Sequence, residues 1–268
     1  MTGPKHGQTS RLHQHSVSYA GSDCCVHRTR AGGPRAAGRR SAHAQASAGI
    51  GTRDQAKEAQ WNSPIQTIET APAAFINIPF HHSFEDLLLG YVAALTCQGF
   101  EPWILPADRY TGRLPDLKKI IQRSRMSLHD MSEKQWRVPR LNMAFELGLA
   151  IGIAESSQAG QPHDVIIFEK SEHRLLKTLS DIRERDPGVH HGTAEGVVMA
   201  VLDRVQRTPL QTNPKLARRV LEELRLEYRR TRRQYGSGAI FKSAGFNYIK
   251  YKAFAIREDL VKGRGSAR

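Results

Sequence analysis

The sequence predicts an α/β fold, a doubly wound parallel sheet of four or five strands, and three observations support this prediction. Between residues 71 and 207, short apolar runs alternate with amphipathic stretches of helical length. Glycine and proline stand at the ends of these segments, where turns are expected. The same region is close to electrically neutral, as a compact globular domain usually is. Strands that alternate with helices imply a parallel sheet covered on both faces.

The expected strands are short apolar segments, several of them closed by proline. They are residues 74–79, 100–105, 126–130 and 164–168, with a short fifth strand near Val189.

The expected helices follow these strands in turn. Ser83 is expected to cap the first helix and Gly99 to end it, while Pro115 opens the second. The others are expected at residues 142–154, 173–185, 194–207 and 214–235.

Charge and composition divide the chain into three parts. Residues 1–70 carry nine Lys and Arg against four Asp and Glu, and their polar composition predicts a disordered basic arm. Residues 71–207 form the expected α/β domain. Residues 208–268 carry 15 basic against five acidic residues and are expected to form a basic helical extension. Its basic and aromatic side chains could contact nucleic acid, or could form the solvated face of a docked helix.

The cysteines and the hydropathy favour a cytoplasmic protein. Cys24, Cys25 and Cys97 form neither a disulfide framework nor a zinc pattern. No apolar run approaches the roughly 18 residues that a membrane span needs. Pairs such as His81-His82 have no further ligand at a suitable spacing, so we expect no metal. No glycine-rich phosphate loop is present, so no cofactor is expected.

Glu146 is the ionisable residue of an otherwise apolar segment, residues 141–154, which is expected to form a helix buried on all sides. A buried carboxylate is costly unless it is paired, hydrogen-bonded or kept for chemistry. Asn142 is a suitable N-cap, and the helix dipole would then favour a carboxylate at position 146. Both a structural and a functional role therefore remain open for Glu146.

Ligands of doubly wound folds bind at the carboxyl ends of the strands. The residues expected to meet there are the ends of the first three strands and the start of the Glu146 helix. They include Asn77, Pro79, Phe80, Asp108, Asp130 and Asn142.

Three segments, Phe75–Phe80, His129-Asp130 and Asn142–Gly152, together resemble the nucleoside 2-deoxyribosyltransferase-like superfamily. The resemblance covers residues 74 to about 207 and implies a flavodoxin-like topology, which is also similar to that of TIR domains. It implies that Glu146 is the nucleophile at an anomeric carbon and that Asp130 donates or orients a proton. It also implies that Pro79 and Phe80 form the pocket wall, and that a neighbouring subunit can complete the pocket in a homo-oligomer.

The chain departs from the family in the loop before Glu146. The transferases usually place an acidic residue six positions before the nucleophile, where this chain has Arg140. Trp136 and Arg137 stand in the same loop. These residues suggest a changed pocket in which Arg137 and Arg140 contact phosphate and Trp136 stacks on a base, or else a solvated loop with one anchoring tryptophan.

Three functional hypotheses follow. The first is an enzyme that cleaves or exchanges an N-glycosidic bond in a nucleoside, a nucleotide or NAD, because two carboxylates suit an oxocarbenium-like transition state. The second is a non-catalytic nucleotide sensor of a stress or defence system. The third is a nucleic-acid-associated protein that acts through its basic ends.

Overall fold

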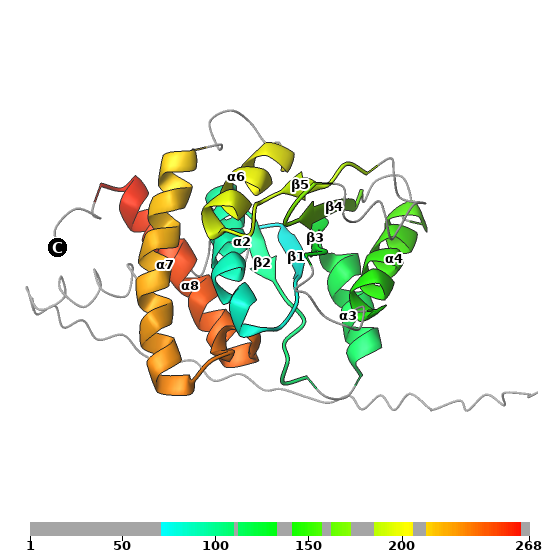
Figure 1. The fold of residues 1–268 in the computed structure, drawn as a ribbon, viewed down its shortest axis with the longest axis horizontal. Helices are drawn as coiled ribbons and strands as arrows, with labels where there is room; N and C mark the ends of the chain where they lie inside the picture. The colour runs from blue at the N-terminus through cyan, green and yellow to red at the C-terminus, as the bar shows by residue number, and fades with distance from the viewer. Residues whose placement is uncertain are drawn as a thin grey trace, which may run out of the picture. The chain divides into compact units, whose positions relative to one another are not determined.

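The computed structural model describes residues 71–109, 112–132, 141–156, 162–172, 185–205 and 213–263. A five-stranded, all-parallel sheet lies at its centre, as the sequence predicts (Figure 1). The strands have the order β2-β1-β3-β4-β5. Their bounds are β1 (Ala73–Asn77), β2 (Glu101–Trp103), β3 (Met126–Asp130), β4 (Asp164–Glu169) and β5 (Gly188–Val189).

Helices cover both faces of this sheet. Those on one face are η1 (His82–Phe84), α2 (Glu85–Cys97) and α6 (Ala194–Arg204), with α7 (Pro214–Tyr235), η3 (Ala239–Phe241) and α8 (Ser243–Val261) packed outside them. The other face carries α3 (Arg113–Arg123) and α4 (Leu141–Ser156) (Figure 1). The expected helix at residues 173–185 falls almost wholly outside the described residues.

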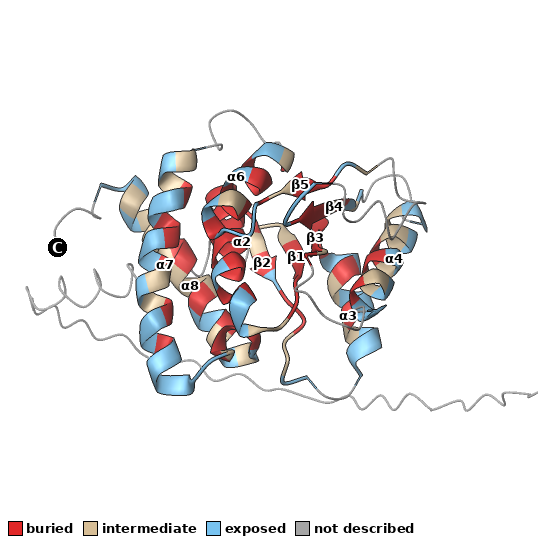
Figure 2. Cartoon of the chain, viewed as in Figure 1, coloured by how far each residue is buried: buried red, intermediate tan, exposed pale blue. Residues whose placement is uncertain are grey.

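Helix α2 is the central helix of the larger core. It packs between the sheet on one side and α6, α7 and α8 on the other, and residues 87–97 are all buried (Figure 2). A helix that is apolar on every side is expected to occupy such a position. Gly90 permits the close approach of α6, because a Cβ atom there would lie 2.7 Å from the carbonyl oxygen of Ala194. Gly99, at φ +80°, ends the helical segment as predicted.

Two predicted helix caps are wrong. Ser83 lies inside η1, and the His81 side chain accepts a hydrogen bond from the Ser83 backbone N–H instead. Asn142 is the second residue of α4, so its backbone is already helical. Both helical segments begin one or more residues before the position that the side-chain preference indicates, which is the usual uncertainty of a helix end.

The prediction that the Glu146 helix is buried on all sides is also wrong. Only Met143, Leu147 and Ala150 of α4 are buried, and Leu147 and Ala150 belong to the hydrophobic core beneath α3. Leu141 is 75% exposed and Phe145 is 56% exposed. Within the described residues, α4 packs against the sheet and α3 on one side, and no described element covers its other side. An apolar sequence therefore does not by itself predict that a helix is buried on every side.

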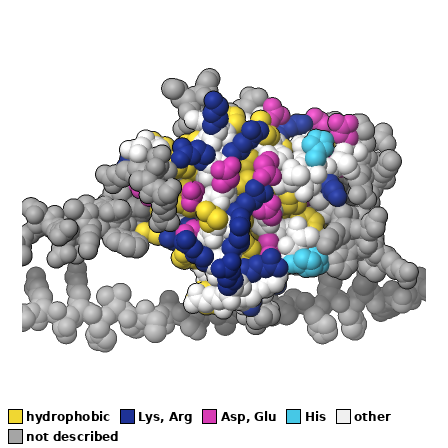
Figure 3. Space-filling model, turned by 60° about the vertical axis from the view of Figure 1, so that its left-hand side comes forward, with side chains coloured by type: hydrophobic (Ala, Val, Ile, Leu, Met, Phe, Trp, Pro, Cys, Tyr) yellow, Lys and Arg dark blue, Asp and Glu magenta, His cyan; other side chains and the backbone are white. Residues whose placement is uncertain are grey.

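The C-terminal helices share the core of the α/β domain. Residues such as Leu224 and Phe246 belong to the same hydrophobic cluster as α2. The buried carboxylate of Glu85, at the start of α2, accepts hydrogen bonds from the Ser237 hydroxyl and the Gly238 backbone N–H. Arg225 of α7 is paired with acidic residues of α2 and α6. Figure 3 shows basic side chains with acidic ones between them on this side of the protein.

Among the described residues, no helix combines the length and the apolar composition that crossing a membrane requires.

Candidate active site at the carboxyl edge of the sheet

A small hollow of about 110 Å³ opens beside Glu146 at the carboxyl ends of the strands. It lies where the predicted site was expected, between the end of β1, the start of α3 and the first turns of α4. The polar side chains that line it are Asn77, Arg113, Asn142 and Glu146. The remaining lining residues are Phe75, Ile76, Ile78, Pro79, Phe80, Leu105 and Met143.

Glu146 is partly buried, and this burial raises the pKa of its carboxyl group. The positive charge of Arg113 and a hydrogen bond from the Asn77 side chain act in the opposite direction and lower the pKa. The carboxylate therefore faces a mixed environment of hydrocarbon, one amide and one guanidinium group. Such an environment suits a carboxyl group that changes its charge or its bonding during a reaction.

The wall of the hollow is supported by the C-terminal extension. Pro79 is buried, and the Phe80 ring stacks on Phe241 of η3 with ring centroids 4.9 Å apart. The Ala107 backbone N–H donates to the Phe241 carbonyl oxygen over 2.7 Å. Residues after 208 thus help to shape the site, a role that their basic composition does not indicate.

A chain of polar groups, buried except for the half-buried His163, leads away from Asn77 along the sheet. The Asn77 Nδ2 atom lies 3.1 Å from His129 Nδ1, and His129 Nε2 lies 2.9 Å from the Ser127 Oγ atom. Ser127 Oγ also lies 2.9 Å from His163 Nε2, and His163 Nδ1 lies 2.9 Å from the Ser124 carbonyl oxygen. Burial and the neighbouring His163 lower the pKa of His129 to about 3.

Acid is therefore expected to destabilise the protein through His129. The unfolded chain binds a proton at this residue near the ordinary pKa of 6.5, whereas the folded protein does not until about pH 3. The contribution of neutral His129 to the free energy of unfolding is complete above pH 6.5. It falls as the pH drops from 6.5 to about 3, by up to about 1.4 kcal/mol per pH unit. Urea denaturation at several pH values should show a shallower slope for His129→Gln than for the wild type. Equal slopes would contradict this assignment.

Asp130 lies away from the hollow, in a separate network with no exposed surface. Its Oδ1 atom accepts from the Ser132 backbone N–H over 2.9 Å, and its Oδ2 atom accepts from the Tyr91 hydroxyl over 3.2 Å. His190 Nε2 lies 3.4 Å from Oδ2 and 2.9 Å from Ser132 Oγ. The Gly192 backbone N–H donates to His190 Nδ1, so the proton of the neutral ring is on Nε2.

Asp108 also lies outside the hollow. Its carboxylate accepts hydrogen bonds from the backbone N–H and the hydroxyl of Ser243, the first residue of α8. These bonds hold the pKa of Asp108 below its ordinary value. An acceptor at this position satisfies the first turn of α8, so Asp108 anchors the extension.

The predicted residues Trp136, Arg137 and Arg140 lie outside the described residues. Arg113 lines the hollow but was not predicted to do so, because its helix was expected to start at Pro115. His129 and His163 were not predicted as functional either, since single histidines in or before a strand carry no recognisable motif.

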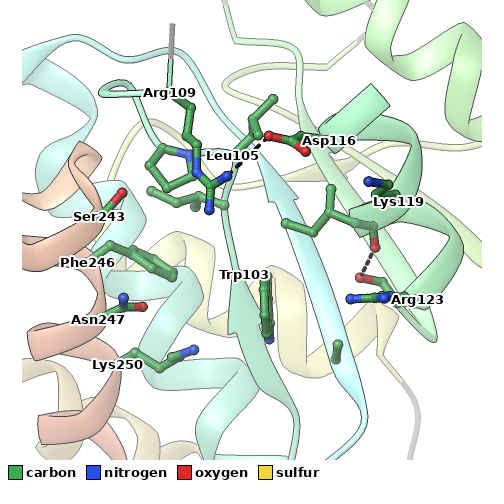
Figure 4. Close-up of a pocket in the computed structure, with 15 residues that line it drawn as sticks. Trp103, Leu105, Arg109, Asp116, Lys119, Arg123, Ser243, Phe246, Asn247 and Lys250 are labelled. Atoms are coloured by element: carbon green, nitrogen blue, oxygen red, sulfur yellow. Dashed lines mark hydrogen bonds and ion pairs between the residues drawn. The ribbon is translucent and has the colours of Figure 1, made fainter. Parts of the chain in front are cut away.

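A second hollow of about 530 Å³ lies at the free edge of β2, between α3 and α8 (Figure 4). Trp103 stands in it, 39% exposed, with Lys250 Nζ 4.7 Å from the ring centroid. Lys119 and Arg123 of α3 line it as well, and neither forms an ion pair within the described part of the chain. Arg109 is paired with Asp116 on the same side.

The arrangement defines an α/β protein with a five-stranded parallel sheet that is compatible with the flavodoxin-like fold. Neither a protein-family model, nor a curated protein, nor a solved structure matches the chain.

Proposed function

We propose that this protein cleaves or exchanges an N-glycosidic bond of a nucleoside, a nucleotide or NAD, with Glu146 as the nucleophile. One observation carries the proposal. Among the described residues, Glu146 is the carboxylate that lines the hollow at the carboxyl edge, where ligands of doubly wound folds bind. The resemblance of residues 142–152 to the glutamate segment of nucleoside 2-deoxyribosyltransferases supports the same assignment.

The chemistry assigns roles to Glu146, Asn77 and Arg113, three of the polar residues in the hollow. Departure of the base leaves positive charge on the sugar carbon, and an adjacent carboxylate can stabilise or attack that carbon. Asn77 holds the carboxylate through its amide, and Asn142 lies one helical turn before Glu146. Arg113 can contact a phosphate or another anionic group of the substrate.

Asp130 has a supporting role in this proposal. Both its oxygen atoms already accept hydrogen bonds inside the protein, so it orients its neighbours and does not meet the substrate. Through His190 it fixes the backbone at Gly192, just before α6.

The proposal is tested by incubating the full-length protein with a panel of nucleosides, nucleoside monophosphates and NAD. Free base, detected by chromatography, is the expected product from at least one member of the panel. Thermal stabilisation by a nucleotide without any product would instead favour a nucleotide sensor. If no member of the panel yields free base and none stabilises the protein, both functions are contradicted.

The second hollow favours a different candidate function, binding of single-stranded nucleic acid. An exposed tryptophan can stack on a base, and Lys119 and Arg123, both on α3, can contact phosphates on one side of the hollow. This site would use α8 together with α3, and not the basic extension alone.

Binding at this hollow is measured by fluorescence polarisation of a short labelled single-stranded oligonucleotide. Changing both Lys119 and Arg123 to glutamine should weaken binding and reduce its salt dependence by about one unit of slope for each phosphate that is no longer neutralised. Lys262→Gln is the control, because Lys262 is exposed and does not line the hollow. If the double variant binds as the wild type does, this hollow is not the binding site.

A further inference from the structure

The buried chain from Asn77 to Ser124 has a defined direction, which follows from its last member. A backbone carbonyl can only accept a hydrogen bond, so His163 must carry a proton on Nδ1 to bond the Ser124 oxygen. The neutral His163 ring then has a bare Nε2 atom. The Ser127 hydroxyl, 2.9 Å away, must donate its single proton to that atom.

The same reasoning fixes the next two groups. Because the Ser127 proton is directed at His163, the Ser127 oxygen accepts from Nε2–H of His129. Burial keeps His129 neutral, with a pKa of about 3, so its Nδ1 atom is bare. Only an N–H donor can occupy the position facing that atom, and this donor is Nδ2 of Asn77, 3.1 Å away.

The orientation of the Asn77 amide is what matters to Glu146. An amide has a donor end and an acceptor end, and either could face the carboxylate. With one N–H engaged by His129, the second N–H of Nδ2 remains for Glu146, in agreement with the hydrogen bond that lowers its pKa. A reversed amide would present its oxygen to His129 and would change the group that Glu146 meets.

We infer that His129, Ser127 and His163 are positioning residues that fix the Asn77 amide with its donor end toward Glu146. The chain runs along the sheet face from the carboxyl end of β1 to the residues that precede β3 and β4. Fully satisfied networks of this kind specify one arrangement, because any reversal brings two acceptors face to face with no proton between them. The functional meaning of this inference rests on the proposed role of Glu146.

The direct test is the tautomeric state of the two histidines in the full-length protein at neutral pH. The ¹⁵N NMR shift of a bare ring nitrogen differs strongly from that of a protonated one. We expect opposite tautomers, with the proton on Nε2 of His129 and on Nδ1 of His163. A proton on Nδ1 of His129 would overturn the inference. This result does not depend on activity, so a protein that releases no base could still confirm the positioning chain.

Three variants test the link to Glu146. Ser127→Ala removes the central hydroxyl, so His129 should populate both tautomers and the carboxyl pKa of Glu146 should rise further. Ser127→Thr keeps a hydroxyl and should restore the wild-type tautomer. Ser124→Ala is the control, because it removes a neighbouring hydroxyl but leaves the carbonyl oxygen that ends the chain. Identical tautomers and Glu146 titrations in all three variants would contradict the inference, and the wild-type tautomers decide it if Ser127→Ala does not fold.

Discussion

Replacing Asp130 by alanine is expected to lower the free energy of unfolding by about 2–6 kcal/mol, because two buried donors lose their acceptor at about 1–3 kcal/mol each. The substitution leaves the Tyr91 hydroxyl and the Ser132 backbone N–H without their acceptor in a region that water does not reach. It also removes the carboxylate that lies 3.4 Å from His190 Nε2. Burial and the nearby Asp130 carboxylate raise the pKa of Tyr91, so its hydroxyl stays protonated and needs this acceptor.

Urea denaturation of the full-length protein measures this loss. Asp203→Ala is the matched control, since the Asp203 side chain is largely exposed and its contact with Arg204 is 3.7 Å long. Its effect should stay within about 0.5 kcal/mol. A loss below about 1 kcal/mol for Asp130→Ala would show that Asp130 does not organise the buried network.

Glu146→Gln is expected to reduce base release by at least about 10⁴-fold, because loss of a covalent nucleophile can cost about 10⁶-fold in kcat. Glutamine has nearly the same shape but carries no charge and cannot attack the sugar carbon. Because burial disfavours the carboxylate, the variant should fold at least as well as the wild type at neutral pH.

The control for this experiment lies on the same helix. Glu155→Gln makes the same chemical change at an exposed position of α4 that does not line the hollow, and it should keep full activity. Turnover of the Glu146→Gln protein at the wild-type rate would remove Glu146 from the mechanism.

The strand pattern was predictable because buried parallel strands and their terminating residues leave strong local signals. The third strand was predicted at its observed bounds, residues 126–130, and α7 likewise at residues 214–235. Helix burial was less predictable. Both α2 and α4 are apolar, yet only α2 is enclosed, because α7 and α8 cover it from the far end of the sequence. Burial of this kind depends on tertiary contacts that no short window contains.

The candidate site was predictable in part for a similar reason. Asn77 and Glu146 were expected at the carboxyl edge, and the hollow brings them together. Asp130 ends its strand as expected, but its side chain turns into a buried cluster of polar groups around Tyr91 and His190. The direction of a side chain at a strand end depends on the neighbours that satisfy it. Those neighbours lie 39 and 60 residues away in the sequence.

The charge state of Glu146 is the most direct test of the central claim, that a partly buried carboxyl group faces an open hollow and is available for chemistry. NMR titration of ¹³C-labelled glutamate in the full-length protein can follow this group, with its signal assigned by its absence in Glu146→Gln. The structure predicts a pKa above the ordinary value of 4.5. A pKa at or below 4.5 would mean that the group is open to water or firmly paired, and would contradict the claim.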